Sequence, residues 1–212
     1  MDEQSSRQVT GQVSLRVFAT ATVTRMTHLW IRWAEVAVDS ERLSLAAKRQ
    51  RDPQNPPVAL SSEFSHGMVA VCASMFAMDA ITWALAKSVI PKTAEKWQGQ
   101  SRPPSSLNMM QQVLGHTIDG TTANALIFRW KKPLGSRHEA VHFWEDSRPS
   151  VCYDGLNVSV EDANYSSDAA TQAVDLLLET LEEITNRPKT AATEWGKSFR
   201  GQVQVLRDRH NR

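Results

Sequence analysis

The side chains best suited to chemistry gather in one stretch of the sequence, from Ser136 to Trp144. Arg137 stands five positions before His142, and His138 directly follows the arginine. Histidine titrates near neutral pH and serves as a general acid or base, whereas arginine keeps its charge and binds phosphate through two parallel hydrogen bonds. The residue types therefore indicate chemistry on a phosphate ester.

The spacing of Arg137 and His142 sets a geometric condition. Five residues of a helix rotate by about 140° beyond one full turn, so a straight helix does not stack the two groups. A helix start or an irregular turn would let both reach one cavity, and Pro133 and Gly135 favour such a turn. We therefore predict that the preceding helix breaks over residues 131–135, immediately before the motif.

The pattern R-(N/D/H)-x-x-x-H over residues 137–142 resembles the signature of the HEPN superfamily of small helical domains, many of which are RNases. The motif's position, after a helical stretch and before a late amphipathic helix, is also similar to that family. The resemblance implies an up-and-down helical bundle. It also implies a homodimer in which the paired motifs face each other across the interface.

For members that cleave RNA, the resemblance implies a reaction without metal or other cofactor. The motif histidine, here His142, acts on the proton of the ribose 2′-hydroxyl or of the leaving oxygen. Arg137 stabilises the phosphorane, and His138 takes the polar second position with Glu139 beside it as a supporting residue. One histidine–arginine set lacks a separate acid and base, so a second subunit or His138 would supply the missing group.

Two other interpretations involve the same residues. Many members of the superfamily are non-catalytic and serve as partners of nucleotidyltransferases or as RNA-binding scaffolds, and an antitoxin is a further partner of this kind. In a purely structural interpretation, Arg137 pairs with Glu139 on a surface helix while His142 packs beneath Trp144.

A zinc hydrolase is the rival enzyme. His138-Glu139-Ala140-Val141-His142 matches the H-E-x-x-H pattern in full, in which two histidines one turn apart bind zinc and the glutamate is the base. That pattern requires a long helix and a third ligand downstream, for which residues 161, 162 and 168 offer carboxylates. The exit by Ser147-Arg148-Pro149 shortens the helix, so we rank zinc below a metal-independent site.

Phosphate affinity must be local in this chain. The 212 residues carry a net charge of +1, so no global field attracts nucleic acid. Basic side chains nevertheless surround the motif, and we predict that they bind RNA: Arg129, Lys131, Lys132 and Arg148.

The elements that must position this motif are predicted to be helices. The fold class is all-α, a single helical domain over residues 1–212. It divides into a HEPN-like core over 61–186, as the resemblance implies, and a C-terminal helix over 187–212. Periodicity and capping signals predict helices over 13–48, 62–90, 107–116, 121–130, 166–186 and 190–209, a small hairpin over 151–160, and loops over 50–57 and 92–104.

The long central helix over residues 62–90 carries a stripe of small residues, including Gly67, that allows another helix to approach closely. It is apolar enough for a membrane span, yet Asp79 lies past its centre, where an acid costs about 3 kcal/mol. We therefore interpret it as a buried core helix and expect no membrane. A carboxylate there needs a partner, which is either a local group such as Thr82 or Arg137 of the site.

Location and assembly follow from coarser features. The N-terminus is polar and shows no secretory signal, and Cys72 and Cys152 are expected to be thiols in a reducing cytoplasm. The aromatic side chains of Trp130, Phe143 and Trp144 are expected to be exposed near the motif, and with the small-residue stripe they predict a homodimer.

Overall fold

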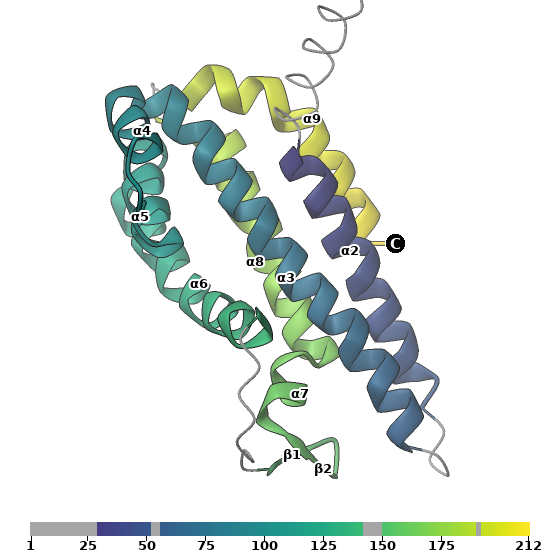
Figure 1. The fold of residues 1–212 in the computed structure, drawn as a ribbon. Coiled ribbons are helices and arrows are strands. Elements are labelled where there is room, and N and C mark those ends of the chain that lie inside the picture. Colours follow the sequence, from purple (N-terminus) through teal and green to yellow (C-terminus); the bar gives the residue numbers. More distant parts are fainter. Residues whose placement is uncertain (1–28, 52–55, 142–149, 190–191) are drawn as a thin grey trace, which may run out of the picture.

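The computed structural model describes residues 29–51, 56–141, 150–189 and 192–212. In this part of the chain the protein is almost entirely helical, with one two-stranded sheet (Figure 1). The all-α class is therefore confirmed. The first part of the helix predicted over residues 13–48 lies outside the described residues.

Four helices form the bundle that contains most of the core. They are α2 (Leu29–Arg49), α3 (Pro56–Val89), α8 (Ser167–Asn186) and α9 (Thr193–His210). Figure 1 shows α2 beside α3, with α8 behind α3 and α9 along α2. Trp30 of α2 closes the bundle against α9, with its ring centroid 5.3 Å from that of Phe199 and 5.7 Å from that of Trp195.

Helix α3 is the central element, as predicted, although it begins at Pro56 rather than at Ser62. Its side chains at Met75, Met78 and Ile81 are fully buried, and it packs against α2, α4, α5, α6 and α8. Leu60–Val89 is also long and apolar enough to cross a membrane, and 56% of the 18-residue window that meets this criterion is buried inside the protein. Its contacts on several sides identify it as the core helix of the bundle.

A second group of helices lies against the α3 side of the bundle: α4 (Pro91–Gln98), α5 (Ser106–Thr117) and α6 (Gly120–Val141). The prediction of a loop over residues 92–104 is wrong at its start, because α4 occupies residues 91–98. Pro91 stands at the first helical position, where its missing N–H costs nothing, and Ala94 and Trp97 are buried three residues apart. The polar residues that predicted a loop lie on the exposed face of α4.

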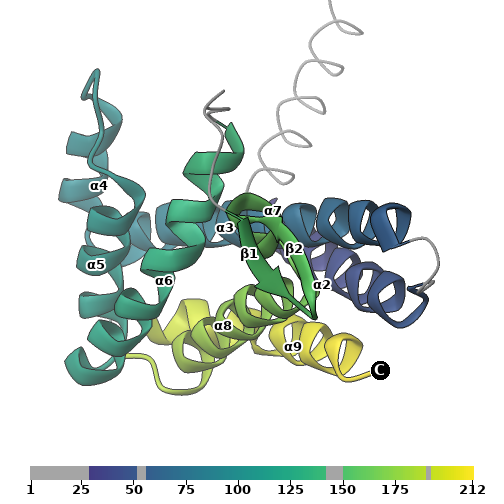
Figure 2. The ribbon, with the colours of Figure 1, turned by 90° about the horizontal axis from the view of Figure 1, so that it is seen from below.

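The predicted hairpin is confirmed. Strand β1 (Ser150–Tyr153) pairs antiparallel with β2 (Leu156–Ser159), with Val151 opposite Val158. Asp154 and Gly155 both adopt positive φ, 49° and 79°, as a two-residue hairpin turn requires. A short helix α7 (Val160–Asn164) follows. Figure 1 shows the hairpin and α7 below the start of α8, and Figure 2, seen from below, shows them in front of the bundle.

Gly67 has the closest neighbour among the described glycines, and this neighbour is a turn rather than another helix. A Cβ added to Gly67 would lie 1.8 Å from the carbonyl oxygen of Tyr165 and 3.3 Å from that of Ser166. The backbone between α7 and α8 therefore packs directly on α3. At Gly67 the small-residue stripe therefore accommodates the α7–α8 turn. The expectation that another helix packs on the stripe at this position is wrong.

Gly67→Ala is expected to lower the free energy of unfolding by about 1–3 kcal/mol, because the added methyl group must displace backbone. Gly135→Ala is the matched control: it is also a helical glycine, and nothing lies within 4 Å of its added Cβ. Urea denaturation of both variants measures the effect. Equal midpoints for the two variants would show that the α7–α8 turn does not constrain α3.

Neither Cys72 of α3 nor Cys152 of β1 takes part in a disulfide. Both are described residues, so the prediction of two thiols is confirmed.

Candidate functional site

Helix α6 carries the start of the Arg137–His142 motif, and it is continuous from Gly120 to Val141 with Pro133 inside it. The predicted break over residues 131–135 is therefore wrong. Proline removes one backbone donor and normally destabilises a helix interior, and Gly135 adds to that cost. Packing on both sides of Pro133 supplies the stabilisation that composition does not reveal.

Two buried hydrogen bonds fix α6 on either side of Pro133. Before it, Trp130 is fully buried and its Nε1 donates to Thr180 Oγ1 of α8 at 3.1 Å. After it, the Tyr165 hydroxyl donates to the backbone carbonyl of Ser136. Trp130 was expected on the surface, and this expectation is wrong because its indole fills the space between α6 and α8. The exposed aromatic residue of this segment is Phe128, at 71%.

The motif residues follow this anchored turn directly. Arg137, His138 and Glu139 belong to the last turns of α6, and their side chains lie outside the described part of the structure. His142 and Arg148 fall in residues 142–149, also outside it. The roles assigned to these five residues stay predictions.

The predicted basic residues on α6 do not form one patch. Lys131 lies over the exposed ring of Phe128, with Nζ 5.3 Å from the ring centroid. Arg129 forms an ion pair with Glu179 of α8 at 2.6 Å. Lys132 and Arg129 both line a pocket on the α8 side of the helix.

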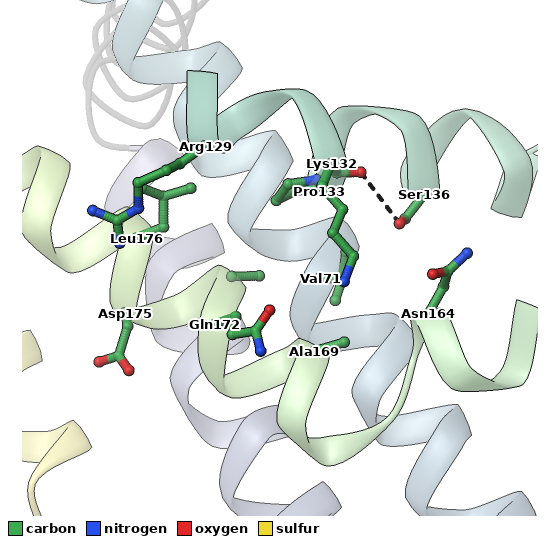
Figure 3. A pocket seen from close by; sticks show the side chains of 11 residues that line it. Val71, Arg129, Lys132, Pro133, Ser136, Asn164, Ala169, Gln172, Asp175 and Leu176 are labelled. Carbon is green, nitrogen blue, oxygen red and sulfur yellow. Dashed lines mark hydrogen bonds between the residues drawn. The ribbon is translucent and has the colours of Figure 1, made fainter. Parts of the chain in front are cut away.

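This pocket has a volume of about 360 Å³ and lies between α6, the end of α7, and α8. Figure 3 shows Lys132 reaching from α6 over Val71, with the side chains of Asn164 and Gln172 bordering the same space. Its apolar floor comes from Val71, Ala173 and Leu176, which are at most 3% exposed. Small-molecule sites combine such a floor with a few polar groups, in volumes of about 300–1,000 Å³.

Asp79 lies elsewhere on α3. It is partly buried, and it stands eight residues beyond the pocket residue Val71, about 12 Å along the helix. Within the described residues, Asp79 does not line the pocket. Its predicted role in orienting Arg137 stays a prediction. The local alternative with Thr82 is wrong, because the buried Thr82 hydroxyl makes no hydrogen bond among the described residues.

The sequence analysis missed a charged network around Glu63, near the start of α3. Glu63 is fully buried and accepts hydrogen bonds from the Tyr153 hydroxyl at 2.7 Å, from the Ser167 N–H at 3.1 Å and from Arg51 Nε at 3.0 Å. Arg51 also contacts Asp154 at 3.1 Å, and Lys48 binds Asp168 at 2.9 Å. The network joins α2, α3, the hairpin and α8.

The electrostatics of this network favour the charged forms. Burial alone would raise the pKa of Glu63, but hydrogen bonds from Tyr153, Arg51 and Ser167 outweigh it and hold the pKa below its ordinary value. Burial would likewise lower the pKa of Lys48, yet hydrogen bonds with Asp168 and Tyr153 raise it. Each charged group of the network therefore has a hydrogen-bond or ion-pair partner. We interpret the network as a structural clamp that holds the hairpin against the helices.

The sequence held one usable signal for this clamp. Glu63, like Asp79, is an acid inside a helix that is otherwise apolar nearly all round. It was interpreted as a first-turn residue because the helix was expected to begin at Ser62. The observed start at Pro56 places Glu63 two turns inside α3, where a carboxylate requires partners.

Among the described side chains, no group of three His, Cys, Asp or Glu residues could hold a metal ion. The side chains of the His138-Glu139-x-x-His142 set lie outside the described part of the structure, so the zinc interpretation is not tested. Comparisons of the chain with protein-family models, with curated proteins and with solved structures found no match.

Proposed function

We propose that this protein is an RNA-binding helical domain that cleaves RNA without a metal, through Arg137 and His142. The observation that carries the proposal is the continuity of α6 through Pro133, with a lysine-bearing pocket on the turns directly before Arg137. The HEPN-like resemblance places the motif after a helical stretch, and α6 supplies that stretch up to Val141. The pocket adds a place for part of a phosphate-bearing ligand beside that motif.

The chemistry that this site would perform is transesterification at phosphorus. The ribose 2′-oxygen bonds to phosphorus and the bond from phosphorus to the 5′-oxygen breaks. The upstream fragment then ends in a 2′,3′-cyclic phosphate, and the downstream fragment leaves with a 5′-hydroxyl. One proton leaves the 2′-hydroxyl for a base and one reaches the 5′-oxygen from an acid, so the net reaction consumes no proton. His142 serves in one of these transfers, and Arg137 stabilises the charge on the phosphorane.

The second proton-transfer group would come from His138 or from the His142 of a second copy. The dimer that this second option requires is part of the proposal. With Trp130 buried, support for it comes from Phe128 of α6, whose side chain is 71% exposed. Light scattering at micromolar concentration tests it, and a monomer that still cleaves RNA would assign the second group to His138.

The proposal is tested by incubating the purified chain with total cellular RNA in EDTA. Cleavage that leaves cyclic phosphate termini is the expected result. An inert wild type that binds RNA would indicate the non-catalytic scaffold, as a partner of a nucleotidyltransferase or antitoxin. Activity that appears only after zinc is added would instead identify His138-Glu139-x-x-His142 as a metal site.

A further inference from the structure

The pocket between α6 and α8 carries one uncompensated charge. Arg129 is neutralised by Glu179 at 2.6 Å, and Asp175 lies 3.5 Å from Arg207 of α9. Within the part of the chain that the structure describes, no acid pairs with the ammonium group of Lys132, which reaches into the pocket (Figure 3). The pocket therefore favours a ligand with a single anionic group near α6.

The rest of the lining suits a flat ring with polar edges. Gln172 presents an exposed carboxamide, which offers both a donor and an acceptor. Pro133 and Ala169, which are partly exposed, offer aliphatic carbon to the face of a ring, above the buried apolar floor of the pocket. An unstacked nucleobase is recognised in this way, by hydrogen bonds to its edge and apolar contact with its face.

We infer that this pocket binds one unpaired nucleotide of a single-stranded RNA, with the base over the Val71 floor and a phosphate on Lys132. The inference rests on the proposed function, since Arg137 follows the pocket residue Ser136 directly. A base paired within a duplex cannot enter the pocket. The site therefore selects single strands, and Gln172 selects among bases.

The pocket can be tested without any cleavage, by titrating the whole protein with AMP, GMP, CMP and UMP. Amide chemical shifts of Gln172, Ala173 and Leu176 report binding. Lys132→Met is expected to weaken nucleotide binding about 10- to 100-fold, because it removes a charge-assisted hydrogen bond. Gln172→Leu is expected to reduce the difference in affinity between the four nucleotides.

Matched controls lie on the helices away from the pocket. Lys96→Met on α4 and Gln111→Leu on α5 alter exposed side chains of the same types and are expected to leave nucleotide affinity unchanged. Equal binding of inorganic phosphate and all four nucleotides would overturn the inference, as would pocket resonances that do not shift.

Cleavage is scored separately, so the two ideas fail in different ways. If the wild type cleaves RNA while Gln172→Leu and Lys132→Met keep its base preference and affinity, the nucleotide pocket is wrong and the proposed function stands. If nucleotides bind as expected but no RNA is cleaved, the pocket stands and catalysis by His142 is wrong.

Discussion

Replacing His142 with alanine is expected to reduce RNA cleavage by about 10²–10⁴-fold, the usual contribution of a general acid or base. The effect should fall on the rate, because the phosphate contacts come from Arg137 and Lys132. Affinity for single-stranded RNA and the unfolding midpoint are expected to change little. The measurement is cleavage of a fluorescent oligonucleotide in EDTA, with binding followed by anisotropy.

His116→Ala is the matched control, since His116 is exposed on α5 and its ring contacts only the carbonyl of Gln112, at 2.8 Å, among the contacts in the described structure. It is expected to leave cleavage unchanged. Equal activity of wild type and His142→Ala would remove the histidine from the mechanism. An equal loss of binding and cleavage would make His142 a binding residue instead.

Arg137→Lys separates the bidentate contact from the charge. Lysine keeps the positive charge but cannot reproduce the two parallel hydrogen bonds that arginine makes to phosphate. Cleavage is therefore expected to fall strongly while the salt dependence of RNA binding stays the same. Full activity in this variant would show that a point charge is enough, which the motif-based role of Arg137 does not allow.

The helices that could be predicted from the sequence are those with a strong periodic or capping signal. Helix α8 begins where Ser166 caps it, with the Ser166 hydroxyl accepting from the N–H of Ala169. The turn at Asp154-Gly155 fixed the hairpin, because both positions need positive φ. These signals are local, so neighbouring residues alone decide them.

The features that could not be predicted depend on residues far apart in the chain. Proline and glycine near position 133 indicate a break by their own preferences. Long-range contacts, among them those of Trp130 with Thr180 and of Tyr165 with Ser136, override these preferences. The sequence did not predict the pocket either, because Lys132 and Gln172 stand forty positions apart and line one pocket only when α6 packs on α8. The candidate site was therefore predicted as a stretch of α6, without the α8 side that completes it.

The clamp around Glu63 gives the largest expected effect on stability. Arg51→Met is expected to lower the free energy of unfolding at neutral pH by about 3–5 kcal/mol, because it leaves a fully buried carboxylate without its cation. The Tyr153 hydroxyl and the Ser167 N–H remain, but neither carries a charge. Arg32→Met is the control, since Arg32 pairs with Glu35 on the surface and such pairs contribute about 0–1 kcal/mol.

The pH dependence of this difference identifies its origin. The pKa of Glu63 is lowered in the folded protein, so the carboxylate contributes stability above its unfolded pKa of about 4.3, and this contribution is lost as the pH falls through the folded value. Without Arg51, one of the hydrogen bonds that lower the pKa of Glu63 is lost while the opposing effect of burial stays, so the pKa of Glu63 moves up. Urea unfolding at several pH values should therefore show wild type and Arg51→Met furthest apart near pH 7 and converging on acidification. A constant difference across that range would mean that Arg51 stabilises the fold through packing on Tyr153 alone, where its guanidinium lies 5.1 Å from the ring centroid.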